Sequence, residues 1–222
     1  MKTSGIVFDM ARLFTQPVVT DALIDKSRYH FNGTANAISA WEKLPSGLYC
    51  PKMVSASSSY YAVPDITPLL GAKQATWMGW VRKDAYVQYS SVMNDFGAVG
   101  SRRWRFGYEG AENRWYCDAG DGTTFVPISI SSIFTTGWHF VWERFTGGSA
   151  TGLECGCDGS TATPVSVATV LTLGVGVKNQ TYIGRAGVYS SITLATLRIH
   201  NIAISDSEIW KYRESTRRMI GI

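Results

Sequence analysis

The segment Trp138-His139-Phe140-Val141-Trp142-Glu143-Arg144-Phe145 decides the fold. Successive side chains of a β-strand point to opposite faces, so this segment projects large apolar groups on both sides. A strand of that kind is expected in the middle of a sheet. We therefore expect residues 138–145 to form a central strand.

Similar short runs recur along the chain, each rich in β-branched or aromatic residues and bounded by Gly, Asn, Asp, Ser or Pro. Turn signals such as Ser46-Gly47, Asp121-Gly122 and Asp158-Gly159 lie between them. This spacing predicts an all-β sandwich or barrel. The other expected strands are 5–10, 60–63, 76–82, 87–93, 104–108, 115–118, 152–157, 180–184 and 192–201.

One short helix is expected at the C-terminal end. Ser205-Asp206-Ser207-Glu208 reads as a capping box, with Ser205 as N-cap and Glu208 at the third helical position. Ile209 and Tyr212 then recur at helical spacing. No linker, repeat or low-complexity segment interrupts the sequence, so residues 1–222 are expected to form a single domain.

Composition limits the classes of protein that need to be considered. The 222 residues are 45% hydrophobic and 13% aromatic, which excludes a disordered chain. The formal net charge of +4 is mildly basic, and the two small basic clusters, 102–105 and 213–218, are expected to be a solvated hairpin and a helix end. Nucleic acid is therefore not an expected partner.

Neither an export signal nor a membrane span is recognisable in the sequence. The N-terminal residues lack the apolar stretch of a signal peptide, and the longest apolar tract, 165–177, is interrupted by polar residues. We therefore expect synthesis in the cytoplasm and no membrane insertion. The cysteines, which lack the Cys-x-x-Cys pairs of a zinc knuckle, are expected to be free buried thiols: Cys50, Cys117, Cys155 and Cys157.

Eight short motifs, in the correct order, resemble the laminin G-like, concanavalin A-like jelly-roll family. Gly137-Trp138-His139-Phe140-Val141 resembles the family's Trp-His-His-Val-Ala strand, and Leu153 to Gly159 resembles Leu-Tyr-Val-Asp-Gly. Tyr182-Ile183-Gly184 matches Tyr-Ile-Gly. The remaining matches are 5–10, 25–34, 60–64, 76–82 and 197–209. The resemblance implies an all-β, two-sheet antiparallel jelly-roll sandwich with one short C-terminal helix.

The resemblance also raises the question of calcium, because many laminin G-like domains carry a structural Ca²⁺ held by loop oxygens. Asp25, Ser27 and Asn32 match the loop that would contribute ligands. However, Ala195-Thr196 stands where the family often places an acid, just before the Val-Arg of the last strand. No cofactor is required by the sequence, and these three residues are its candidates for a metal.

The sequence does not predict an enzyme. Glycosidases on this fold place acids at Glu-x-Asp-x-Glu spacing on one strand face, and no such run occurs here. A Cys–His pair such as Cys117 with His139 stays open, although a strand histidine among aromatics is more often a packing residue.

Two compatible functions remain, and both are non-catalytic. One is a lectin-like module that binds a glycan or protein surface, with Trp41, Trp104, Tyr108 and Trp115 as candidate stacking residues. The other is a virion component, such as a phage decoration, tail or fibre protein, that contacts capsid or tail proteins. In that case the basic C-terminal helix is a candidate for homo-oligomer contacts. The alternative is a plain lectin-like module from a larger extracellular system.

Overall fold

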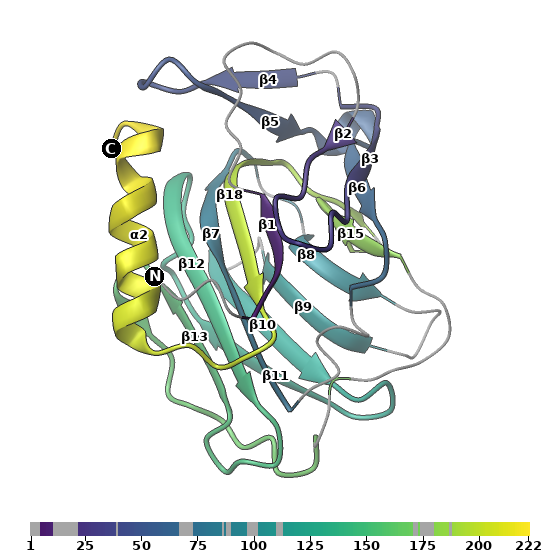
Figure 1. Ribbon diagram of the computed structural model, residues 1–222, viewed down its shortest axis with the longest axis vertical. Coiled ribbons are helices and arrows are strands. Elements are labelled where there is room, and N and C mark those ends of the chain that lie inside the picture. The colour runs from purple at the N-terminus through teal and green to yellow at the C-terminus, as the bar shows by residue number, and fades with distance from the viewer. Residues whose placement is uncertain are drawn as a thin grey trace.

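Two antiparallel β-sheets face each other, and one helix lies against the outside of the first sheet (Figure 1). The computed structural model describes residues 5–10, 22–38, 40–66, 73–85, 87, 90–96, 102–109, 113–170, 173, 180–186 and 188–222. The predicted all-β sandwich is confirmed.

The first sheet, sheet A, contains eight strands among the described residues. Its order is β14-β13-β12-β7-β18-β5-β4, and β1 also pairs with β18. The strands are β1 (Ile6–Met10), β4 (Ala40–Lys43), β5 (Tyr49–Met53), β7 (Gln74–Lys83), β12 (Gly137–Thr146), β13 (Leu153–Cys157), β14 (Ser160–Thr161) and β18 (Ile192–His200).

The second sheet, sheet B, has the order β11-β10-β9-β8-β15-β6-β3-β2. A small hairpin of β16 (Arg185–Ala186) and β17 (Val188–Tyr189) follows β15, and a 3₁₀ turn, η1, covers Ser55–Ser57. The strands of sheet B are β2 (Ala22–Leu23), β3 (Gly33–Asn36), β6 (Tyr60–Val63), β8 (Ser90–Phe96), β9 (Arg102–Glu109), β10 (Arg114–Gly120), β11 (Phe125–Ile130) and β15 (Thr181–Ile183).

The main core fills the space between the sheets and is dominated by aromatic side chains. Trp77 of β7 meets Trp104 of β9 with ring centroids 5.2 Å apart, which joins the two sheets directly. Each buried aromatic side chain contributes roughly 1.5–3 kcal/mol through removal of its apolar surface from water. Because side chains of a strand alternate between its two faces, this energy favours the orientation in which the aromatic face of each strand turns toward the core.

The C-terminal helix α2 (Asp206–Ile220) packs on the outer face of sheet A. Ile209, Tyr212 and Ile220 form a second buried cluster there with Phe140 and Trp142 of β12. The predicted capping box is confirmed, because Ser205 accepts a hydrogen bond from the Glu208 backbone and the Glu208 side chain reaches back to the Ser205 backbone. None of the described helices is long and apolar enough to cross a membrane.

Strand β12 confirms the expectation for residues 138–145. Val141 and Phe145 belong to the core between the sheets, whereas Phe140 and Trp142 belong to the cluster under α2. The strand pairs with β7 along its full length and with β13 on its other side, so it is internal to sheet A.

The remaining predicted strands all have counterparts, although β8 begins three residues later than predicted. Several short strands were not predicted, and neither was β11, which contains Pro127. A proline has no N–H group to donate to a neighbouring strand. Strand β11 tolerates Pro127 because, among the described strands, it lies at an edge of sheet B.

Candidate functional site

Three of the four predicted stacking aromatics face the core, so that part of the binding prediction is wrong. Trp104 is 1% exposed, and Tyr108 and Trp115 are fully buried. Phe134 lies 5.1 Å from the ring centroid of Tyr108 and 5.2 Å from that of Trp115. These rings pack between the sheets and cannot present a face to a sugar. Trp41, on β4 of sheet A, is half-buried and stays a prediction.

The predicted calcium loop is organised by its own hydrogen bonds. The buried Asp25 carboxylate accepts the backbone N–H groups of Asp9, Ser27 and Phe31 and the hydroxyl of Ser27, at 2.7 to 2.9 Å. Asn32 uses its side-chain oxygen to accept the Asp25 backbone N–H at 3.0 Å. Each Asp25 oxygen thus accepts two hydrogen bonds, and the geometry gives these residues a role in holding the loop against β1.

Acidic residues that lie close together in the sequence could in principle form a catalytic pair, and four of them, Asp118, Asp121, Glu154 and Asp206, have structural partners instead. Asp118 is fully buried and paired with Arg105, with 3.0 Å between charged atoms. Asp121 accepts the N–H groups of Thr123 and Thr124 in a hairpin turn. Arg144 is paired with both Glu154 and Asp206. Glu112, from another of these pairs, lies outside the described residues.

The strongest candidate for a binding surface lies on the outer face of sheet B, the side that points away from the core. Three tyrosines from three strands surround one arginine: Tyr60 of β6, Tyr182 of β15, Tyr189 of β17 and Arg185 of β16. We name these four residues the tyrosine–arginine cluster. All four are half-buried, so part of each stays accessible.

Arg185 is held at the centre of the cluster by the aromatic rings. Its guanidinium carbon lies 5.0 Å from the ring centroids of Tyr60 and Tyr182 and 5.4 Å from that of Tyr189. Cation–π contacts of this kind contribute roughly 0.5–1 kcal/mol each at exposed sites. Among the described residues, no carboxylate pairs with this guanidinium. A fixed, half-exposed positive charge therefore lies among aromatic rings.

The backbone under the cluster is constrained. Gly184, immediately before Arg185, has a φ of 82°, and a Cβ there would lie 2.7 Å from the Met53 side chain. Only glycine fits this position without strain. The side-chain amide of Asn94 on β8 donates to the carbonyl of Arg185, which fastens the β16–β17 hairpin to sheet B.

The same outer face carries a groove of about 390 Å³ where β10 and β11 meet the segment after β14. Tyr116 and Pro127 supply apolar surface to the groove, and Arg114, Ser129 and Thr163 supply polar groups. The register of sheet B places Tyr182 opposite Asn94, Asn94 opposite Arg105 and Arg105 opposite Asp118. The groove and the tyrosine–arginine cluster thus lie at opposite sides of one sheet face.

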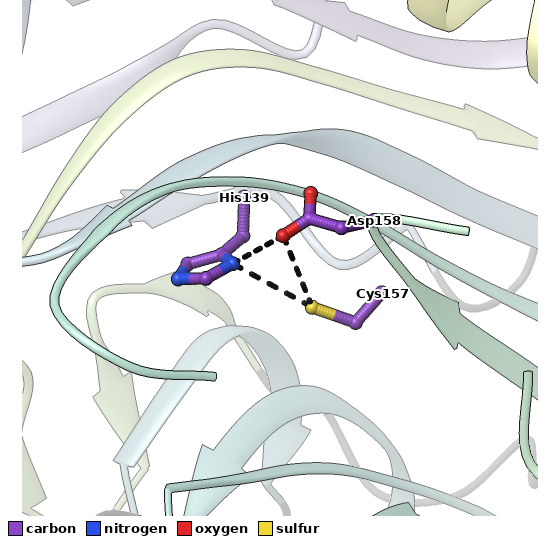
Figure 2. A group of neighbouring side chains, drawn as sticks. All are labelled: His139, Cys157 and Asp158. Carbon is purple, nitrogen blue, oxygen red and sulfur yellow. Dashed lines mark hydrogen bonds and ion pairs between the residues drawn. The ribbon is translucent and has the colours of Figure 1, made fainter. Parts of the chain in front are cut away.

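A second group of reactive side chains lies at the β13–β14 turn (Figure 2). His139, Cys157 and Asp158 bring an imidazole nitrogen, a sulfur and a carboxylate oxygen within 4.8 Å of one another. These are the residues that could hold a metal ion among those described. The pair of Cys117 with His139, which the sequence left open, is not among the contacts of His139, whose sulfur neighbour is Cys157. All four cysteines are buried and free, as predicted.

The comparisons with known proteins identify the fold. No family model and no curated protein matches the chain. Solved structures match, among them the binding domain of botulinum neurotoxin DC in complex with SialylT, at a TM-score of 0.66 and 13% identity. The same domain in complex with rat synaptotagmin II matches at a TM-score of 0.67 and 12% identity.

A third match is a structure of botulinum neurotoxin type C, at a TM-score of 0.65 and 12% identity. Its description states that cell entry of this toxin depends on interaction with two ganglioside molecules. These matches cover 96% of this chain and 52% of theirs, so the chain spans about half the length of the structures it resembles. At this identity the likeness shows the fold alone. The chain is a two-sheet β-sandwich of the jelly-roll type.

Proposed function

We propose that the protein is a non-catalytic binding module that recognises acidic glycans through the tyrosine–arginine cluster. The observation that carries the proposal is the Arg185 guanidinium, which is held by three tyrosine rings and has no carboxylate partner among the described residues. A guanidinium binds a carboxylate or sulfate with two parallel hydrogen bonds.

The tyrosines suit a sugar for a separate reason. Sugars dock their C–H faces on aromatic rings, and neighbouring polar groups fix their orientation. The Tyr182 hydroxyl already donates to the exposed Gln180 side chain at 3.2 Å, so polar groups border the rings. The similar neurotoxin domains, with SialylT and gangliosides as their described ligands, add support from the same fold.

Three finer hypotheses belong to this proposal. The order of the sequence motifs favours laminin G-like kinship within the jelly-roll class. The free cysteines suit folding in a reducing cytoplasm, which favours a virion surface component released by lysis. The competing placement is a carbohydrate- or protein-binding lectin-like module of a larger extracellular system, and the neurotoxin domain in complex with rat synaptotagmin II is an example of protein binding on this fold. Co-purification of the protein with virions from an infected lysate would favour the virion placement. Virions that lack the protein would reject it.

A glycan array tests the proposed function. The array should carry sialylated, uronic acid-containing, sulfated and neutral glycans at matched density. We expect binding to acidic glycans, a loss of at least tenfold in Arg185→Gln, and a smaller loss in Tyr182→Phe than in Tyr182→Ala.

Arg218→Gln is the matched control. It removes the same charge from an exposed position on α2, on the side of sheet A. It should bind as the unmodified chain does. Equal binding by Arg185→Gln, or no binding to any acidic glycan, would reject the proposal.

A further inference from the structure

His139, Cys157 and Asp158 converge on a single point beside the β13–β14 turn (Figure 2). His139 Nδ1 lies 2.5 Å from an Asp158 carboxylate oxygen and 3.8 Å from the Cys157 sulfur. The sulfur lies 4.0 Å from that same oxygen. Three different donor atoms therefore form a small triangle.

The arrangement does not fit a catalytic triad. In a Cys–His–Asp triad the acid contacts one imidazole nitrogen and the nucleophile contacts the other. Here both Cys157 and Asp158 face Nδ1, and Nε2 is taken by the Thr135 carbonyl at 3.1 Å.

The Thr135 contact orients the imidazole for a different role. Because a carbonyl only accepts, Nε2 must carry the proton in this hydrogen bond. A proton shared between Nδ1 and the Asp158 carboxylate completes their hydrogen bond in the metal-free chain, and a metal ion that replaces this proton meets the Nδ1 lone pair, the carboxylate oxygen and the sulfur. Metal-binding histidines are oriented in this way, with the second nitrogen donating to a carbonyl or carboxylate.

The remaining contacts hold the other two donors in place. The second Asp158 oxygen accepts the Phe140 backbone N–H at 2.8 Å, which fixes the carboxyl group at the turn. Asp158 and Gly159 have φ values of 51° and 106°, so the hairpin turn brings the acid back over β12. Phe134 packs on the imidazole with ring centroids 4.9 Å apart.

We propose that His139, Cys157 and Asp158 form a binding site for one zinc ion, with Nδ1, the sulfur and one carboxylate oxygen as ligands. Zinc accepts this combination of donors at bond lengths of about 2.0–2.3 Å, which sets tetrahedral ligand atoms roughly 3.3–3.6 Å apart. The two distances to sulfur need to shorten slightly, and the oxygen needs to move away from Nδ1.

That adjustment is available to Asp158. Its side chain is 36% exposed, whereas that of His139 is 9% exposed, so the acid can shift and solvent can reach the site. Water takes the fourth position. Zinc then links the beginning of β12 to the β13–β14 turn, and it stabilises the folded chain because the unfolded chain lacks the assembled site.

Metal titration of the full chain tests the site. Protein freed of metal with a chelator is titrated with Zn²⁺ under reducing conditions and examined by native mass spectrometry and calorimetry. We expect one Zn²⁺ per chain and a higher melting temperature. Co²⁺, used as a spectroscopic probe in place of Zn²⁺, should give a thiolate-to-cobalt charge-transfer band in the near ultraviolet.

Variants at matched positions identify the ligands. Cys157→Ala should lose the charge-transfer band and weaken Zn²⁺ binding at least tenfold. Cys155→Ala, a buried cysteine on the same strand, should retain both. Asp158→Asn keeps a residue that tolerates the positive φ and should weaken Zn²⁺ binding.

Two results would overturn the inference, one from the unmodified chain and one from a variant. A Co²⁺ titration without a thiolate band, or Zn²⁺ binding that is unchanged in folded Cys157→Ala, would contradict the site. Neither result depends on whether glycans bind.

Discussion

Trp115 and Tyr116 are consecutive residues of β10 that face opposite sides of sheet B. Trp115 is fully buried, with its ring centroid 4.8 Å from that of Phe106. Tyr116 is half-buried on the outer face, where the guanidinium carbon of Arg105 lies 4.1 Å from its ring centroid. The alternation of one strand thus separates a core residue from a surface residue next to the groove.

This pair gives the first prediction. Trp115→Ala should lower the free energy of unfolding by roughly 3–5 kcal/mol, because it leaves a cavity between the sheets. Tyr116→Ala removes one partly exposed ring and one cation–π contact, so about 1 kcal/mol is expected. Urea unfolding followed by tryptophan fluorescence and circular dichroism measures both. Equal losses would mean that the assignment of the two faces is wrong.

The second prediction concerns the Asp25 loop. Asp25→Ala leaves four donors without their acceptor, and a loss of at least roughly 2–3 kcal/mol in the free energy of unfolding is expected. Because these hydrogen bonds already occupy the carboxylate, neither Ca²⁺ nor a calcium-selective chelator should shift the melting temperature of the unmodified chain. Differential scanning calorimetry tests this, and a rise in melting temperature with Ca²⁺ would restore the calcium site suggested by the family resemblance.

The third prediction is a pH dependence that comes from Glu143. This residue of β12 is fully buried, and burial raises the pKa of its carboxyl group well above the ordinary value, with the negative charge of Asp118 raising it further. Above the unfolded-state pKa of about 4.3, the unfolded chain has released this proton while the folded chain keeps it. Folding then takes up a proton, so the contribution of Glu143 to stability falls as pH rises.

Glu143→Gln resembles the protonated side chain and removes this proton uptake. The stability of the variant relative to the unmodified chain should therefore increase from about pH 5 upward, by at most about 1.4 kcal/mol per pH unit. Urea unfolding of both proteins at several pH values measures the difference. A difference that is independent of pH, or that shrinks as pH rises, would show that Glu143 is ionised in the fold.

Local patterns predicted an all-β sandwich or barrel, and the family resemblance narrowed this prediction to a two-sheet jelly roll. Apolar groups on both faces of residues 138–145 correctly predicted a central strand, and the structure shows that the second sheet covers one side of it and α2 the other. This prediction depends on strand periodicity, which a single segment reveals.

The binding residues were harder to predict, for two reasons. Trp104, Phe106 and Tyr108 alternate with Arg105 and Gly107, and that alternation already indicates that the aromatic side faces the core. The tyrosine–arginine cluster, in contrast, joins residues from 60 to 189 through the pairing of β15 with β6 and the turn that follows it. Such neighbours depend on tertiary structure, and no local pattern in the sequence indicates them.

The central claim is that ligand binds at the tyrosine–arginine cluster, and an NMR titration tests it most directly. Isotope-labelled protein is titrated with an acidic oligosaccharide that binds on the array, with its neutral counterpart as control. The account predicts that chemical-shift changes concentrate at Tyr60, Tyr182, Arg185 and Tyr189 and are absent from α2. Changes centred on α2 or on Trp41, with the cluster unperturbed, would contradict it.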